Sequence, residues 1–209
     1  MTHGAPGLAP AGSGRAPADA AWVTIDSPLP IEALREFCGD VERLYRINPC
    51  LDIASWRPIA DGTFHAAWRN TSNQQDAALD LQIVHESDDA FEVRYSQGLK
   101  RSTRFALAPA AVGSRLTITD DYSGVPEEER ARRVAEVDPT LVAWGWALHA
   151  YLRRERRWGR NAVYRWYMRR IWLPMKPGAR RITTLLVLVT VAEFLIVLFV
   201  GLIWWVEHR

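Results

Sequence analysis

The chain has 209 residues, a length that suits one domain of ordinary size with additional segments. Its formal net charge of +2 is too small to indicate a nucleic-acid-binding protein. The charge is unevenly placed, however, because eleven basic residues and one acidic residue, Glu155, lie between Arg153 and Arg181. The two cysteines, Cys38 and Cys50, are too few for a disulfide framework, which favours a reducing compartment.

Residues 1–20 are expected to be a disordered leader. The stretch MTHGAPGLAPAGSGRAPADA is rich in Ala, Gly and Pro and has little to bury. It has no apolar core flanked by positive charge, so it does not predict a secretory signal.

A strand, two helices and six further strands are predicted next. The stretch WVTID (22–26) alternates as a strand does, and two prolines then introduce the helical stretch IEALREFCGDVERLYRI, which Gly39 divides into two short helices. Turn residues separate the later strands, which are expected at 51–59, 63–70, 77–86, 90–97, 100–108 and 114–123.

The pattern then changes to helix, beginning near residue 125. Asp138 is expected to restart the helix as its N-cap, with Pro139 at the first helical position. After this point an apolar stripe repeats at helical spacing, so that this face should lie on the sheet. The stripe consists of Leu141, Trp144, Leu148, Tyr151 and Trp158.

This order of elements, and the opening VTIDSPLPIEALREFCGDVERLYRINPCLDIASW in particular, resembles the START/birch-pollen-allergen superfamily, which includes the SRPBCC or polyketide cyclase/dehydrase-like proteins. The resemblance covers about residues 22–157 and includes no catalytic motif. It implies an α+β helix-grip fold, in which a seven-stranded antiparallel curved sheet wraps a long C-terminal helix and leaves an apolar cavity. Members bind lipids, sterols, quinones, hormones or polyketides and some are enzymes, so the fold alone selects no function.

Strand alternation places apolar side chains on one face of the predicted sheet and charged ones, such as Glu92 and Arg94, on the other. The cavity implied by the resemblance would be lined by the first set. Each of these residues has an alternative role as plain core packing. The candidate ligand-contacting residues are Phe64, Trp68, Leu81, Ile83, His85, Phe91, Val93, Tyr95, Phe105, Ile118, Asp120, Tyr122, Trp144 and Leu148.

Four of these candidates are polar or carry a hydroxyl: His85, Tyr95, Asp120 and Tyr122. If they converge in the cavity, they would orient a polar head group or act in acid–base chemistry. The alternative is that each is solvated at a rim. No catalytic motif stands out and no histidines pair at metal-ligand spacing, so we expect neither a metal nor a cofactor. Cys38 lies on an apolar helical face and is expected to be buried and structural.

Residues 158–181 form a basic segment with interleaved aromatic side chains. Arginine and tryptophan suit the interface of an anionic membrane, so the region Arg153–Arg181 is predicted to contact a membrane surface. A solvated continuation of the long helix is the alternative. Binding of single-stranded RNA is disfavoured because an apolar span follows directly.

Residues 182–206 are predicted to cross a membrane. Their 25 residues exceed the ~20 needed for ~30 Å of hydrocarbon, and Trp204 and Trp205 lie where an interfacial belt is expected. A buried core helix, the alternative, would need a polar face. The basic flank precedes the span, which predicts a single-pass, tail-anchored bacterial protein of the inner membrane with its N-terminal domain in the cytoplasm. Glu193, in mid-span, is either a contact with a membrane-protein partner or a mild defect.

These expectations favour a membrane-tethered binding or carrier domain, spanning residues 21–157, for a lipid, isoprenoid or quinone. Two alternatives stay open. One is an interaction subunit of a larger membrane complex, docked through Glu193 and the basic segment. The other is an enzyme of the cyclase/aromatase type acting on a polyketide-like or lipid substrate. Because no catalytic motif is present, we expect a binding protein rather than an enzyme.

Overall fold

A computed structural model describes residues 20–98, 100–123 and 127–208, with side chains in the long helix described from residue 140 onward. The predicted start of that helix at residue 125 lies outside the described residues. The elements in chain order are β1 (Ala20–Ser27), α1 (Ile31–Cys38), α2 (Val41–Ile47), β2 (Leu51–Ala60), β3 (Thr63–Asn70), β4 (Gln75–Ser87), β5 (Ala90–Tyr95), β6 (Ser102–Pro109), β7 (Ser114–Asp121), α3 (Glu127–Trp158), α4 (Ala162–Tyr167), the π-helical turn η1 (Met168–Trp172) and α5 (Pro177–Glu207).

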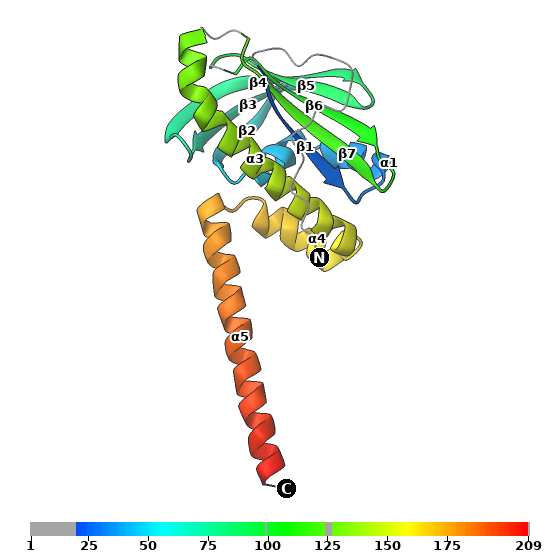
Figure 1. Cartoon of the computed structure of the whole chain (residues 1–209), viewed down its shortest axis with the longest axis vertical. Helices are drawn as coiled ribbons and strands as arrows, with labels where there is room; N and C mark the ends of the chain where they lie inside the picture. Colours follow the sequence, from blue (N-terminus) through cyan, green and yellow to red (C-terminus); the bar gives the residue numbers. More distant parts are fainter. Residues whose placement is uncertain (1–19, 99, 124–126, 209) are drawn as a thin grey trace.

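The seven strands form one antiparallel sheet in the order β1-β7-β6-β5-β4-β3-β2. Strands β2 to β7 form a meander, and β1 pairs with β7 at the edge of the sheet. The sheet curves around α3, which crosses it diagonally (Figure 1). This is the α+β helix-grip architecture that the sequence predicted.

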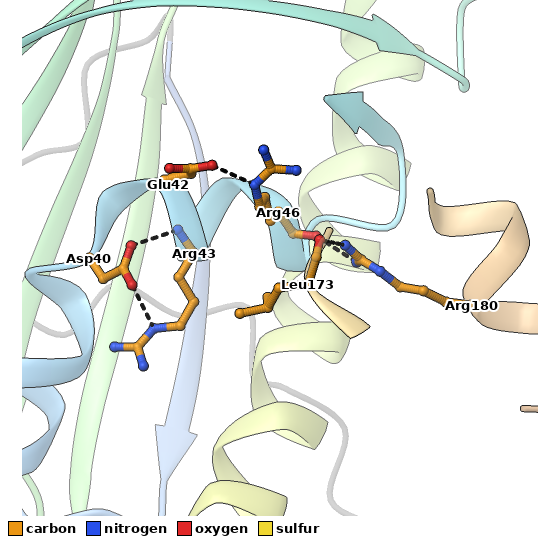
Figure 2. A network of polar contacts seen from close by, with 6 residues as sticks. All are labelled: Asp40, Glu42, Arg43, Arg46, Leu173 and Arg180. Atoms are coloured by element: carbon orange, nitrogen blue, oxygen red, sulfur yellow. Dashed lines mark hydrogen bonds and ion pairs between the residues drawn. The ribbon is translucent and has the colours of Figure 1, made fainter. Parts of the chain in front are cut away.

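The two short helices separate where the sequence indicated. Asp40 leaves the helical conformation after Gly39, and its side chain accepts a hydrogen bond of 3.0 Å from the Arg43 amide as the N-cap of α2. The Arg43 guanidinium also lies 3.7 Å from the Asp40 carboxylate (Figure 2). Both helices bury one side: Leu34 and Leu44 have no exposed surface.

The predicted division of the sheet into two faces is confirmed. Burial alternates residue by residue along β7, and the inward side chains of neighbouring strands, Val93, Phe105 and Ile118, are completely buried. Burying each side chain of this size contributes about 1.5–3 kcal/mol. Leu148 of α3 closes the core from the other side and is also fully buried.

Helix α3 differs from the prediction in one respect. It runs without interruption through Asp138 and Pro139, so the restart expected there is wrong. A proline inside a helix removes one backbone hydrogen bond and kinks the helix, but the flanking turns can continue. Figure 1 shows that α3 changes direction in its first half.

The apolar stripe of α3 is confirmed for four of its five members. Leu141, Trp144, Leu148 and Tyr151 are at most 3% exposed, whereas Trp158 is 47% exposed. Trp158 is the last residue of α3.

Helix α5 extends away from the rest of the protein (Figure 1). Its most apolar window has a mean hydropathy of 2.9 and is wholly exposed, and by length and composition the helix is able to cross a membrane. Among the residues that the structure describes, α5 is the one helix that is long and apolar enough to do so.

We expect Leu148→Ala to lower the free energy of unfolding by about 2–5 kcal/mol, because it removes a fully buried side chain between α3 and the sheet. Val142→Ala, on the same helix but 37% exposed, is the control and should change stability by less than about 0.5 kcal/mol. The measurement is unfolding of the full chain in mild detergent, followed by near-UV circular dichroism. Equal losses in the two variants would contradict the packing described above.

Candidate ligand-binding site

Four aromatic side chains, which we call the aromatic wall, lie together on the inner face of β2 and β3. Trp56 of β2 packs against Phe64 of β3, with ring centroids 5.9 Å apart. The ring of Tyr45, from α2, lies 5.5 Å from Trp56 and 6.2 Å from Trp68. Tyr45 is buried, whereas Trp56, Phe64 and Trp68 are only partly buried. This wing of the inner face therefore retains accessible apolar surface.

The centre of the fold, in contrast, is filled by rings. Trp144 of α3 meets Tyr45 edge-on at 5.4 Å and Phe105 at 5.8 Å, and Phe91 stacks on Phe105 at 4.8 Å. The Trp144 indole also donates a 2.9 Å hydrogen bond to the Leu44 carbonyl. Edge-to-face pairs of this kind stabilise by about 0.5–1.5 kcal/mol beyond their buried area. A ligand would therefore meet the aromatic wall rather than an open centre.

A chain of hydroxyl groups runs from α2 to β7 beside these rings. The hydroxyls of Tyr45 and Tyr95 are hydrogen-bonded, Tyr95 lies 2.7 Å from the Thr103 hydroxyl, and Thr103 donates to Asp120 at 2.6 Å. Thr103 and Asp120 face each other because they are register partners in β6 and β7. Each hydroxyl has one proton, so Thr103 accepts from Tyr95, and Tyr95 in turn accepts from Tyr45.

Asp120 is the negatively charged end of this series of hydrogen bonds, and it is 4% exposed. The Lys100 ammonium lies 3.1 Å from Asp120 Oδ1, and the Tyr122 hydroxyl donates to Oδ2 at 3.4 Å. The same ammonium lies 5.1 Å from the centre of the Tyr95 ring. The buried carboxylate is therefore paired and hydrogen-bonded on both oxygens, as a buried charge requires.

The environment fixes the protonation of this cluster. Burial lowers the pKa of Lys100, but the negative charge of Asp120 and contributions from Tyr122 and Tyr45 outweigh it and leave that pKa above its usual value. Burial, and then the charge of Asp120, raises the pKa of Tyr95, and burial raises the pKa of Tyr45 well above its usual range. At neutral pH both tyrosines keep their protons, so the cluster can hold and orient a polar group.

A separate cavity of about 90 Å³ lies between α1 and the strands β4 to β6. It is smaller than the ~300–1,000 Å³ of a typical pocket for a drug-sized ligand, but exceeds the space that one water molecule needs. Its lining residues are Arg35, Cys38, Gly39, Val41, Ile83, His85, Ser87, Asp88, Phe91 and Leu107.

The structure divides the predicted ligand-contacting residues into groups. Phe64 and Trp68 belong to the aromatic wall, and Tyr95, Asp120 and Tyr122 meet in the polar cluster. Leu81, Val93, Phe105, Ile118, Trp144 and Leu148 are buried in the core. Ile83, His85 and Phe91 line the small cavity.

His85 does not converge with the other three polar candidates, and the alternative of a solvated position holds for it. His85 pairs with Phe91 across β4 and β5, whereas Tyr95 pairs with Leu81. Four residues along a strand correspond to about 13 Å, so His85 lies at the other end of the strand pair. Its side chain is exposed, and its ring is tilted against that of Phe91 with 6.0 Å between ring centroids. The rim position considered for Asp120 is also excluded by its burial.

Sequence reasoning missed Tyr45, Thr103, Lys100 and Trp56. Thr103 precedes Phe105 by two positions, so strand alternation places it on the inner face. A threonine hydroxyl alone, however, does not indicate a functional site. Tyr45 falls within the predicted helical stretch, but nothing in the sequence indicates what its hydroxyl contacts. Lys100 lies in the loop before β6, which begins at Ser102, whereas the sequence placed it at the start of the predicted strand 100–108.

The remaining candidate groups offer no reactive centre. Cys38 is buried as expected, and burial raises the pKa of its thiol to about 12. Burial also raises the pKa of Cys50. Within the described ranges, no three His, Cys, Asp or Glu side chains are grouped to hold a metal ion.

The solved structures to which this chain is similar include the following two. A START superfamily protein from Mycobacterium smegmatis has a TM-score of 0.52 at 15% identity, over 66% of this chain and 99% of that protein. The Zhui aromatase/cyclase from Streptomyces sp. R1128 has a TM-score of 0.54 at 15% identity, over 68% and 97%. No family model and no curated protein matches the sequence. At this identity the likeness shows the fold alone, which is the helix-grip fold.

The polar cluster predicts a loss of stability at alkaline pH. Tyr45, Tyr95 and Lys100 have raised pKa values in the folded chain, so their stabilisation is complete below the unfolded values near 10 and is lost as pH rises above them. Each group contributes a slope of up to about 1.4 kcal/mol per pH unit.

We expect Tyr95→Phe to reduce the fall in the free energy of unfolding with pH by the contribution of about one group. The reason is that the variant has one fewer tyrosine to ionise on unfolding. Tyr167→Phe, at an exposed tyrosine, serves as the control and should leave the slope unchanged. The measurement is the free energy of unfolding of the full chain between pH 9 and 11.5 in detergent. A stability that increases over this range would contradict the prediction.

Proposed function

We propose that the chain is a membrane-tethered binding or carrier protein for a hydrophobic molecule such as a lipid, isoprenoid or quinone. The observation that carries this proposal is the aromatic wall, whose partly buried rings lie beside a buried, hydrogen-bonded polar cluster. Aromatic surface with a few fixed polar groups is the usual lining of a small-molecule site. The START fold supports the same class of ligand. The binding domain would comprise residues 21–157.

Helix α5 would supply the tether, with residues 182–206 in the bilayer and residues 158–181 as the juxtamembrane segment. Its length, its hydropathy and its exposed apolar surface support this role. The basic residues that precede it support a cytoplasmic domain on the inner membrane of a bacterium. A ligand dissolved in the inner leaflet would then be close to the binding domain.

The cluster around Asp120 supports binding in preference to catalysis. Both oxygens of its carboxylate are already occupied by Lys100, Thr103 and Tyr122. Tyr45 and Tyr95 have raised pKa values, which oppose their use as bases near neutral pH. Fixed groups of this kind suit the recognition of a polar end on an otherwise apolar ligand.

The second candidate is a cyclase-type enzyme, favoured by the placement of Asp120 among three hydroxyl-bearing side chains and by the fold shared with an aromatase/cyclase. Cyclisation followed by dehydration releases one water molecule. In that case Asp120→Asn would retain an unconverted precursor heavier than the molecule bound to the wild type. Identical bound masses in the two proteins would count against turnover.

We expect the full chain, extracted from bacterial membranes in mild detergent, to carry one apolar molecule in near-stoichiometric amount. The measurement is native mass spectrometry followed by analysis of an organic extract. Trp68→Gln should lower occupancy about tenfold or more, because a polar amide replaces part of the aromatic wall. Trp146→Gln is the matched control, because Trp146 is exposed on α3.

An empty but folded chain would overturn the binding proposal. It would favour the third role, an interaction subunit that meets a membrane-protein partner through Glu193. Equal occupancy in both tryptophan variants would place the ligand away from the aromatic wall.

A further inference from the structure

The segment formed by α4 and η1 has two chemically different sides. One side packs on the domain, where Met168 and Leu173 belong to the core and Tyr164 and Trp172 are partly buried against it. The other side carries Val163 (73% exposed), Trp166 (59%), Tyr167 and Ile171. These residues, with Arg170, follow helical spacing on one surface, which we call the outer face.

The outer face is unusual within the folded domain. Four large, exposed apolar side chains lie within nine residues of the chain, whereas most others there, such as Ile59 and Val112, are isolated. Single exposed apolar residues need no explanation, but a contiguous patch indicates a contact surface. Arg170 of the outer face and the neighbouring Arg169 are also exposed, and α4 and η1 contain no acidic residue.

Arg180 fixes the position of this face along α5. Its guanidinium donates to the carbonyl of Trp172 at 2.9 Å, of Leu173 at 2.7 Å and of Arg46 at 2.6 Å. It also lies 4.3 Å from the centre of the Trp172 ring. Figure 2 shows the side chain reaching across from α5 to the C-terminal end of α2. Lys176 adds a contact of 2.9 Å to Asp52 of β2.

These contacts place η1 at the level where the apolar run begins. Arg180 precedes Ile182 by two residues, which corresponds to about 3 Å along a helix axis. The headgroup layer on each side of a bilayer is about 5–8 Å thick. If α5 spans the bilayer, the end of η1 therefore lies within that layer. Figure 1 shows α4 running across the direction of α5 rather than along it, as an interfacial helix does.

We propose that the outer face of α4 and η1 lies in the headgroup layer of an anionic lipid bilayer and holds the binding domain against the membrane. Val163, Trp166 and Ile171 would enter the upper acyl region, and Arg169 and Arg170 would meet lipid phosphates. This inference rests on the proposed tether, because the level of the face is set by α5. The charge, the apolar patch and its continuity with α5 favour lipid over a protein partner.

The test uses the full chain, reconstituted in vesicles of phosphatidylcholine and phosphatidylglycerol. Cys50→Ser removes the more accessible thiol, and Cys38 is buried and will not label. A bimane label is attached to a single new cysteine at Val163→Cys. The matched control is Val112→Cys, at an exposed position in the β6–β7 turn, and Val197→Cys reports on the span itself.

We expect lipids brominated near the headgroup to quench the Val163→Cys label at least about threefold more than the Val112→Cys label. Aqueous iodide should show the opposite preference. Replacing Arg169 and Arg170 with Ser should reduce lipid quenching at Val163→Cys in anionic vesicles and have no effect in pure phosphatidylcholine. Trp166→Ser should also reduce it.

Three results would overturn the inference. Equal iodide quenching at Val163→Cys and Val112→Cys, with Val197→Cys quenched by deeply brominated lipid, would leave the tether intact and remove only the interfacial face. Protection of Val163→Cys in native membranes but not in vesicles would assign the face to a protein partner. An unchanged signal after both arginine substitutions would exclude recognition of lipid charge. Failure of deep quenching at Val197→Cys would instead remove the tether, and with it the proposed function.

Discussion

Three consecutive residues at the end of α2 connect every major part of the protein. The carbonyl of Leu44 accepts the Trp144 indole from α3, and the hydroxyl of Tyr45 bonds to Tyr95 of the sheet. The carbonyl of Arg46 accepts the Arg180 guanidinium from α5. The last carbonyls of a helix lack partners within it and attract cations. Here those carbonyls fix the grip helix and the apolar C-terminal helix on one short element.

This arrangement links the candidate site to the orientation of the C-terminal helix. Tyr45 contributes its ring to the aromatic wall and its hydroxyl to the polar chain that ends at Asp120. A shift of α2 would therefore change both the accessible apolar surface and the hydrogen bonds beside it. Arg180 is hydrogen-bonded to the carbonyl of Arg46, the residue after Tyr45. Movement of α5 relative to the domain would therefore displace Tyr45 as well. The fold thus connects α5 to the interior through the short helix α2.

Patterns of period two and 3.6 were sufficient to predict the sheet, the inward faces and the stripe of α3, since burial depends on them directly. The convergence considered for the polar candidates occurs for Tyr95, Asp120 and Tyr122, because they lie at the ends of β5 and β7 on either side of β6. The patterns failed where position depends on tertiary packing. Tyr45 reaches Tyr95 across 50 residues of sequence, and no local pattern encodes that contact. Alternation assigned His85 to the inner face but gave no position along the strand, so it could not place His85 relative to Tyr95.

The balance of charge in the interior restricts the ligand that the proposed function requires. Asp120 and Lys100 already neutralise each other within a largely apolar setting. A carboxylate or phosphate on the ligand would compete with Asp120 for Lys100 and would place two negative charges in one buried region, at a considerable electrostatic cost. A neutral hydroxyl or carbonyl would only need to join the existing hydrogen bonds among Tyr45, Tyr95 and Thr103. The interior therefore favours an isoprenoid alcohol, a quinone or a neutral lipid over a free fatty acid.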